Sequence, residues 1–361
     1  MTKTREHSGR FALFMKWVGI ATALLAFGSA LYGVVHAEAD LRERGRVVAE
    51  QVAAARSQQA AGDYLAAWDS LQRASAIAEV DGMFAKLLGG LGAQRKSVRA
   101  AQEDLAMEWI RGAHAPEGHN FSEIVDRVTP VLVQGAHTST GARRADLLAH
   151  LGWAYFLKQR DGNSDLRPDL QYREAVAADA TNPYANAFWG HFVIWTNGPL
   201  SEGKERFAAA LTTTRARAVV RHFQLAALSN SHAEEVEAEW WRVVDEMHRQ
   251  GEPLDAGTRD KMESKYYFAL DDQSQMKVTL SAIPASEHVE LQRMLLQSGD
   301  FDSGKRLTIT AAMAVALEAA GRKDEALAAW HEVQTSAHHQ MGFTLEGQMN
   351  AALKRLGAHP Q

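Results

Sequence analysis

The order of hydrophobic and polar residues divides the chain into one unbroken apolar stretch and a long series of amphipathic segments. Residues 17–37, WVGIATALLAFGSALYGVVHA, contain no Asp, Glu, Lys or Arg. From residue 38 onward, apolar residues recur mainly at three- and four-residue spacing, the period of a helix with one buried face. No run of alternating β-branched residues is long enough to suggest a sheet. The pattern therefore predicts an all-α protein, an N-terminal apolar helix followed by helical hairpins.

The apolar stretch has the length of a membrane-spanning helix. Its 21 residues would rise about 31 Å as a helix, and the hydrocarbon core of a bilayer is roughly 30 Å thick. Trp17 and Tyr32 lie near its ends, where aromatic rings prefer the headgroup region. A cleaved signal peptide is the alternative, because Val35-His36-Ala37 has the form of a cleavage site, but its apolar part is usually only about 7–15 residues long. We therefore favour an uncleaved transmembrane helix or signal anchor at 17–37.

The basic residues around this span predict its orientation. Four basic residues and one acidic residue precede it, a balance of +3, and three arginines follow it: Lys3, Arg5, Arg10 and Lys16 against Glu6, then Arg42, Arg44 and Arg46. Under the positive-inside rule, we expect residues 1–16 to form a cytoplasmic basic tail. The protein would then be single-pass in a bacterial inner membrane, with its body in the periplasm.

Small residues within the span recur at a spacing that lets two membrane helices approach closely. Thr22, Ala26 and Ala30 are four residues apart, as are Ser29 and Gly33. This spacing suggests weak dimerisation through the transmembrane helix. The alternative, which we favour, is that membrane helices are rich in small residues whether or not they pair.

Residues 145–211 carry the most informative pattern in the body. Tyr172 and Gly190 are 18 residues apart, and Phe207 lies 35 residues after Tyr172. The full set of matching positions is Leu151, Gly152, Tyr155, Tyr172, Ala175, Gly190, Gly203, Phe207 and Ala210. These positions resemble the tetratricopeptide repeat (TPR) family, a helix–turn–helix unit of 34 residues. The resemblance implies an irregular α-solenoid in which glycines permit close helix crossings and aromatic residues fill the space between hairpins.

Weaker copies of this pattern set the expected domain boundaries. Gly62-Asp63-Tyr64, Gly299-Asp300-Phe301 and Gly321-Arg322-Lys323 each have the form of a turn before a helix. We expect degenerate TPR-like, membrane-proximal hairpins over 38–118 and a TPR-like array over 143–361. Between them, Pro130, Gly135 and several Ser and Thr residues predict an irregular connection at 119–142, with a short helix possible inside it.

The resemblance also implies a partner-binding groove. The first helices of such repeats line a concave surface, which places Trp153, Phe156, Tyr184, His191 and Trp195 on or near it. Aromatic side chains offer a large contact area at low entropy cost and therefore suit peptide recognition. For Trp153 and Trp195, burial between helices is an equally good interpretation. Adjacent Trp240 and Trp241 cannot both lie on one side of a helix, so one is exposed or covered by a neighbouring hairpin.

Charge and composition narrow the function further. The chain after residue 37 has 35 basic and 43 acidic residues, a balance of −8, which argues against nucleic-acid binding. There is no cysteine, and no catalytic, nucleotide-binding or cofactor motif is recognisable. His338-His339, with His331 upstream, could bind a metal, but no HExxH motif or carboxylate cluster supports this, and exposed histidines are the favoured interpretation. Arg215, Arg217 and Arg221 could meet an acidic peptide or lipid headgroup, but a solvated helix face is the favoured interpretation.

Together these features predict a non-enzymatic protein without cofactor or metal. The leading hypothesis is a membrane-tethered scaffold or adaptor that holds a protein or peptide partner in a concave helical groove. The alternative is a non-catalytic assembly or regulatory subunit of a cell-envelope enzyme or translocation complex.

Overall fold

The computed structural model describes residues 3–79, 88–113, 121–162, 165–229, 233–336 and 343–357, with side chains from residue 15 onward and excluding 343–344. All regular structure within these ranges is helical, as the spacing of apolar residues predicts. The chain divides into two compact units, residues 1–182 and 183–361, which are described separately.

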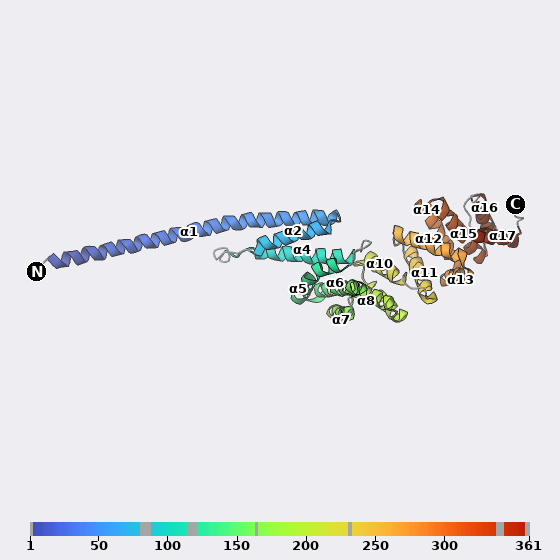
Figure 1. Ribbon diagram of the computed structural model, residues 1–361, viewed down its shortest axis with the longest axis horizontal. Coiled ribbons are helices and arrows are strands. Elements are labelled where there is room, and N and C mark those ends of the chain that lie inside the picture. The colour runs from blue at the N-terminus through green and yellow to red at the C-terminus, as the bar shows by residue number, and fades with distance from the viewer. Residues whose placement is uncertain are drawn as a thin grey trace. The chain divides into compact units, whose positions relative to one another are not determined.

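Helices of the first unit pack in their order along the chain (Figure 1). They are α1 (Lys3–Ala60), α2 (Tyr64–Glu79), α4 (Gly92–Arg111), α5 (Ser122–Thr138), α6 (Gly141–Arg160) and α7 (Pro168–Ala178). Each contacts the next, and α4 also contacts α1 and α6. Leu71, Leu105, Ile110 and Leu132 are fully buried among them, so one apolar core joins α2, α4 and α5.

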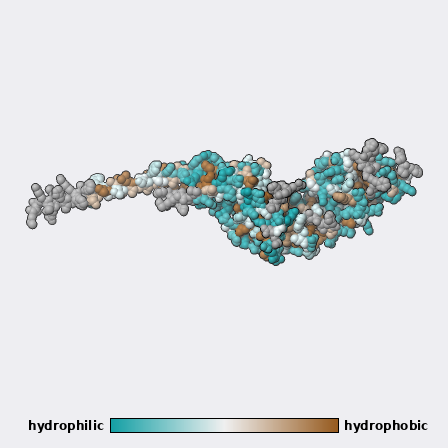
Figure 2. All heavy atoms as spheres, viewed as in Figure 1, coloured by the Kyte–Doolittle hydropathy of each residue, from teal (hydrophilic) through white to brown (hydrophobic). Residues whose placement is uncertain are grey.

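Helix α1 packs against the other helices of its unit only along its C-terminal part (Figure 1). Its C-terminal part buries Val48, Val52 and Ala55 against the following helices. Toward the N-terminus its apolar side chains are exposed (Figure 2). Leu25 is 72% exposed and Phe27 68% exposed. By length and composition, α1 could cross a membrane, a property that signal sequences share.

The segment 119–142, expected to be an irregular connection, is instead largely one helix. Helix α5 occupies Ser122–Thr138 and packs on α4 and α6. Pro130 lies inside α5 without ending it. Burial of Val125, Val128 and Leu132 on one face outweighs the local effect of this proline. The helix considered possible inside this segment is therefore present, and the expectation of an irregular connection was wrong because it weighed turn-forming residues above the helical period of the apolar ones.

Packing in the second unit departs from chain order. Its helices are α8 (Pro183–Trp195), α9 (Leu200–Ala210), α10 (Arg217–Leu228), α11 (Glu234–Arg249), α12 (Ala256–Asp271), α13 (Gln273–Ala282), α14 (Ala285–Ser298), α15 (Ser303–Ala319), α16 (Lys323–Ser336) and α17 (Phe343–Arg355). Helices α8 to α10 contact one another, and α14 to α17 pack consecutively. However, α12 contacts α15 and α17 as well as α13.

The three turns expected at glycines are present. Gly62 separates α1 from α2, Gly299 separates α14 from α15, and Gly321 separates α15 from α16. All three have positive φ, near 75–79°, a conformation that glycine adopts without the steric cost of a Cβ atom.

Candidate functional site

Gly152 and Tyr172, two of the predicted repeat-packing residues, lie directly against each other. The Tyr172 ring from α7 is fully buried, and a Cβ atom at Gly152 of α6 would lie only 2.5 Å from its Cε1. Hence only glycine fits here without displacement of the ring. Leu151 and Ala175 are also buried, whereas Tyr155 is partly exposed.

A similar close crossing joins α8 and α9 in the second unit. A Cβ atom at Gly190 would lie 3.1 Å from both the Gly203 carbonyl oxygen and the Phe207 ring. A Cβ atom at Gly203 would lie 2.6 Å from Ile194. Phe207 and Ala210 are buried on the same side of α9. The structure therefore brings these four predicted packing residues together.

Three of the five predicted groove residues are buried rather than available to a partner. Trp153 is 7% exposed and donates its Nε1 hydrogen to the Ile110 carbonyl oxygen at 3.2 Å, while Phe156 packs against its ring. His191 is 4% exposed, and its Nδ1 lies 3.1 Å from the Phe223 carbonyl oxygen. Tyr184 and Trp195 are partly exposed. The groove assignment is therefore wrong for Trp153, Phe156 and His191, because all three pack inside their own units and the ring nitrogens of Trp153 and His191 bond to carbonyl oxygens there.

Trp240 and Trp241 are both buried, at 1% and 0% exposure. Trp241 packs against Tyr266 of α12 and His288 of α14, with ring centroids 4.8 and 5.1 Å away. Trp240 lies against Trp241 in an edge-on contact. Neighbouring helices therefore cover both sides of α11, which leaves neither indole for a partner.

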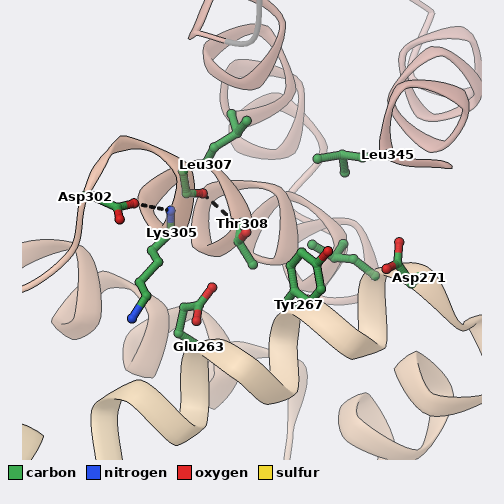
Figure 3. Close-up of a pocket in the computed structure, with 10 residues that line it drawn as sticks. Glu263, Tyr267, Asp271, Asp302, Lys305, Leu307, Thr308 and Leu345 are labelled. Carbon is green, nitrogen blue, oxygen red and sulfur yellow. Dashed lines mark hydrogen bonds between the residues drawn. The ribbon is translucent and has the colours of Figure 1, made fainter. Parts of the chain in front are cut away.

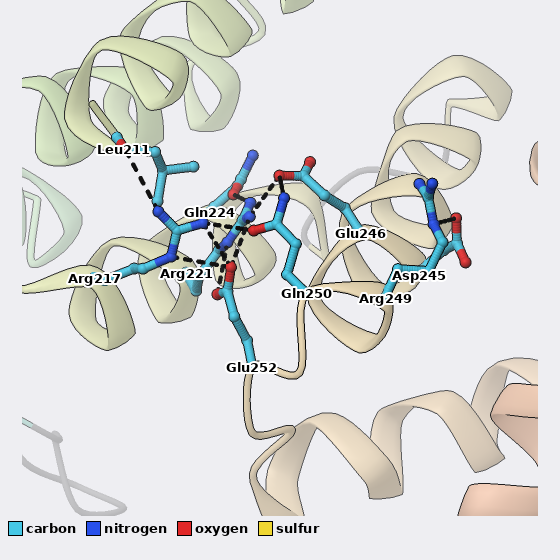
Figure 4. A network of polar contacts seen from close by, with 9 residues as sticks. All are labelled: Leu211, Arg217, Arg221, Gln224, Asp245, Glu246, Arg249, Gln250 and Glu252. Atoms are coloured by element: carbon cyan, nitrogen blue, oxygen red, sulfur yellow. Dashed lines mark hydrogen bonds and ion pairs between the residues drawn. The ribbon is translucent and has the colours of Figure 1, made fainter. Parts of the chain in front are cut away.

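Arg221 lies at the centre of a buried polar network rather than on a solvated helix face (Figure 4). Its guanidinium donates to Glu246 at 2.7 Å, to Glu252 at 3.1 Å and to Gln224 at 3.0 Å. Arg217 adds a second guanidinium, 2.7 Å from Glu252. Burial opposes ionisation of Glu252, but the hydrogen bonds from both arginines lower its pKa overall. The network joins α10 to the end of α11, a structural role that the spacing of the arginines did not predict.

The best candidate binding site is a cavity of about 480 Å³ in the second unit, here called the α12–α15 cavity. Glu263, Tyr267 and Asp271 occur every four residues on α12 and so share one face of that helix. Figure 3 shows Glu263 and Tyr267 extending from α12 toward Thr308 of α15. The other lining residues are Leu270, Asp302, Gly304, Lys305, Leu307 and Leu345.

Carboxylates dominate the charge of the α12–α15 cavity. Glu263 is 7% exposed, and within the described residues it has no hydrogen bond or ion pair. Burial raises the pKa of Glu263, an effect that Lys305 partly offsets. Lys305 itself is paired with Asp260, with its Nζ 2.7 Å from Oδ1. The one lysine that lines the cavity thus forms its ion pair with Asp260, while Glu263 forms no ion pair within the described residues.

Among the described residues, no group of three or more His, Asp or Glu side chains is arranged to hold a metal ion. His338 and His339 lie outside the described residues. The arrangement that is present suits recognition of charge and shape, with carboxylates and an aromatic ring around a water-accessible hollow. Sequence reasoning missed this site because Glu263 and Tyr267 belong to no motif.

Comparison with known proteins does not assign the chain to a family. No protein-family model matches it, and no curated protein sequence does. Among solved structures, the chain is similar to one whose description reads "The hypoxic regulator of sterol synthesis Nro1 is a nuclear import adaptor". The identity is 12% over 88% of this chain and 97% of that one, with a TM-score of 0.34. A likeness this low supports no inference about fold or function.

Proposed function

We propose that the chain is a membrane-tethered helical scaffold whose body binds a protein partner without catalysis. The observation that carries the proposal is the exposed apolar part of α1, which continues without a break into the packed helices of the first unit. Apolar side chains in such a continuous exposed stretch require a lipid or protein environment. Its length matches a bilayer, so a membrane is the environment we infer.

We further propose that α1 is retained as a single anchor, with residues 1–16 in the cytoplasm of a bacterium and the body in the periplasm. The continuity of α1 with the core supports retention, and the basic tail supports this orientation. The body is proposed to be a TPR-like array. The close contacts of Gly152 with Tyr172 and of Gly190 with Gly203 support that resemblance.

Single-cysteine labelling in intact cells tests both retention and orientation, because the chain contains no cysteine. Cysteine replaces Thr4 in one variant and the exposed Glu174 in another, and a membrane-impermeant maleimide is applied to cells with a permeabilised outer membrane. We expect labelling at position 174 only, on protein that stays with the membrane after alkaline extraction. Labelling at position 4, or a mature protein that begins after residue 37, would contradict the proposed topology.

Site-specific photocrosslinking tests partner binding. A photoreactive phenylalanine analogue replaces Phe268, which is 64% exposed on α12 and contacts the ring of Tyr267, a residue that lines the α12–α15 cavity. A control replaces Leu170, which is 42% exposed in the first unit. We expect one discrete crosslinked protein from position 268 and none from position 170. Absence of a discrete product from position 268 in membranes that contain the full chain would count against a partner at this face.

A further inference from the structure

We infer that the α12–α15 cavity binds the guanidinium group of an arginine side chain on the protein partner. This inference rests on the proposed function, because it specifies the chemistry of the partner. It is carried by the combination of an unpaired buried carboxylate, an exposed aromatic ring and a cavity of suitable size.

The first element is Glu263. A buried carboxylate normally has a counterion or several hydrogen-bond donors, because its removal from water is costly. Glu263 has neither within the described part of the chain, although Asp260 on the same helix has Lys305 as its counterion. Since Glu263 lines the cavity, a cation that entered it would supply the missing partner.

The second element is Tyr267, which lies one helical turn from Glu263 and is 51% exposed. Aromatic faces attract cations, and guanidinium groups stack on them readily. Asp271 continues the row by another turn and has no partner among the described residues. A ring between two carboxylates is therefore complementary to a planar cation.

The charges around the cavity, moreover, disfavour an anion. Helix α15 begins beside it, and helix N-termini attract negative charge. Here the Asp302 carboxylate already occupies that position and accepts the Lys305 backbone N–H at 2.9 Å. Together with Glu263 and Asp271, it gives the cavity three carboxylates against one paired lysine.

The volume of about 480 Å³ falls within the range of roughly 300–1,000 Å³ that is typical of small-ligand sites. Leu270, Leu307 and Leu345 provide apolar walls for the methylene groups of a long side chain. Arginine satisfies these requirements better than lysine, because its planar guanidinium group can stack on the Tyr267 ring and at the same time donate hydrogen bonds to a carboxylate.

Fluorine NMR on the full-length chain in detergent micelles tests this inference. The seven tyrosines are replaced by 3-fluorotyrosine, and Tyr267→Phe assigns the Tyr267 signal by its disappearance. The probe is N-acetyl-arginine amide, titrated to about 20 mM, well above the Kd of a millimolar contact. N-acetyl-citrulline amide, of nearly the same shape but uncharged, is the comparison ligand, and N-acetyl-lysine amide separates planar from compact cations.

We expect the arginine probe to shift the Tyr267 signal to saturation, the lysine probe to bind more weakly and the citrulline probe to have no effect. Glu263→Gln should weaken arginine binding about tenfold or more, because it removes the charged acceptor. Asp324→Asn, which removes a negative charge from an exposed position outside the cavity lining, should leave the affinity unchanged. Equal shifts with citrulline, no shift with arginine, or unchanged affinity in Glu263→Gln would each overturn the inference.

The two proposals fail separately. Loss of membrane association or of crosslinking would contradict the scaffold role without affecting the titration of the Tyr267 signal. A partner captured from position 268, combined with no response to arginine, would contradict only the chemistry proposed for the cavity.

Discussion

His288 makes the stability of the second unit depend on pH. This side chain of α14 is fully buried against Trp241 and Tyr266. Its Nε2 lies 2.8 Å from the Thr279 carbonyl oxygen, which can only accept, so Nε2 carries the hydrogen. Nδ1 then accepts from the Tyr266 hydroxyl at 3.0 Å. Both nitrogens are satisfied in the neutral ring, and a second proton on Nδ1 would disrupt the bond from Tyr266.

The magnitude follows from the pKa of His288. Burial lowers it from 6.5 to about 4, although the hydrogen bond to Thr279 favours the charged form. At a pH between about 4 and 6.5, the His288 ring is therefore protonated in the unfolded chain but neutral in the folded chain. The contribution of His288 to the free energy of unfolding is fully present above its pKa in the unfolded chain, and it is lost as the pH falls toward its pKa in the folded chain. By linkage, the loss is about 2 kcal/mol on going from pH 7.5 to pH 5 and about 3 kcal/mol in the acidic limit.

Urea unfolding of the full chain in detergent micelles at pH 7.5 and pH 5 measures this loss. His288→Gln is the informative variant, because an amide can donate and accept hydrogen bonds but does not titrate in this range. We expect the pH-dependent loss of unfolding free energy to be smaller in His288→Gln than in the unmodified chain by about 2 kcal/mol. His331→Gln, at an exposed position on α16, is the control and should behave like the unmodified chain. The reasoning is refuted if His288→Gln loses as much stability at pH 5 as the unmodified chain.

Two further substitutions test the packing of each unit by the same urea assay. Gly152→Ala should destabilise the first unit by about 1–3 kcal/mol, since the new methyl group would overlap the buried Tyr172 ring. Gly347→Ala, where a Cβ atom meets nothing within 4 Å, should be neutral or slightly stabilising, and equal losses would contradict the argument. Arg221→Ala should cost about 2–3 kcal/mol, because it removes a buried guanidinium from its bonds with Gln224, Glu246 and Glu252 and leaves Glu252 with Arg217 as its remaining counterion. Arg293→Ala, in an exposed ion pair with Glu290, should leave the urea midpoint unchanged, and a midpoint shift as large as that of Arg221→Ala would argue against burial as the cause.

Features that depend on neighbouring residues were predictable from the sequence. The helical period, the turns at Gly62 and Gly321 and the apolar stretch at 17–37 each arise within one or two helices. The contact between Gly152 and Tyr172 also joins only adjacent helices, and the resemblance to the repeat pattern indicated both positions as packing residues.

Features that depend on distant residues were not predictable. The sequence alone favours a surface cluster for Arg221, because its partners Glu246 and Glu252 lie 25 and 31 residues later in the chain. Whether Trp153 lines a groove or a core depends on the position of Ile110, 43 residues earlier. Helical period identifies the apolar face of a helix but not which neighbour covers it.

The α12–α15 cavity illustrates the same limit and gives it a functional meaning. Met262, Tyr266 and Leu270 form the buried face of α12, and Glu263 lies only one residue further around the helix. If each helix contacted only its neighbours in the chain, the face of α12 that carries Glu263 would point to solvent, and Glu263 would be an ordinary surface carboxylate. Instead α15 and α17 contact α12, and the Gln348 side chain donates to the Leu270 carbonyl oxygen. The carboxylate is therefore buried without a counterion because the order of helices in space departs from their order along the chain. Such departures are where a binding site is most easily missed when a helical array is analysed by its repeats.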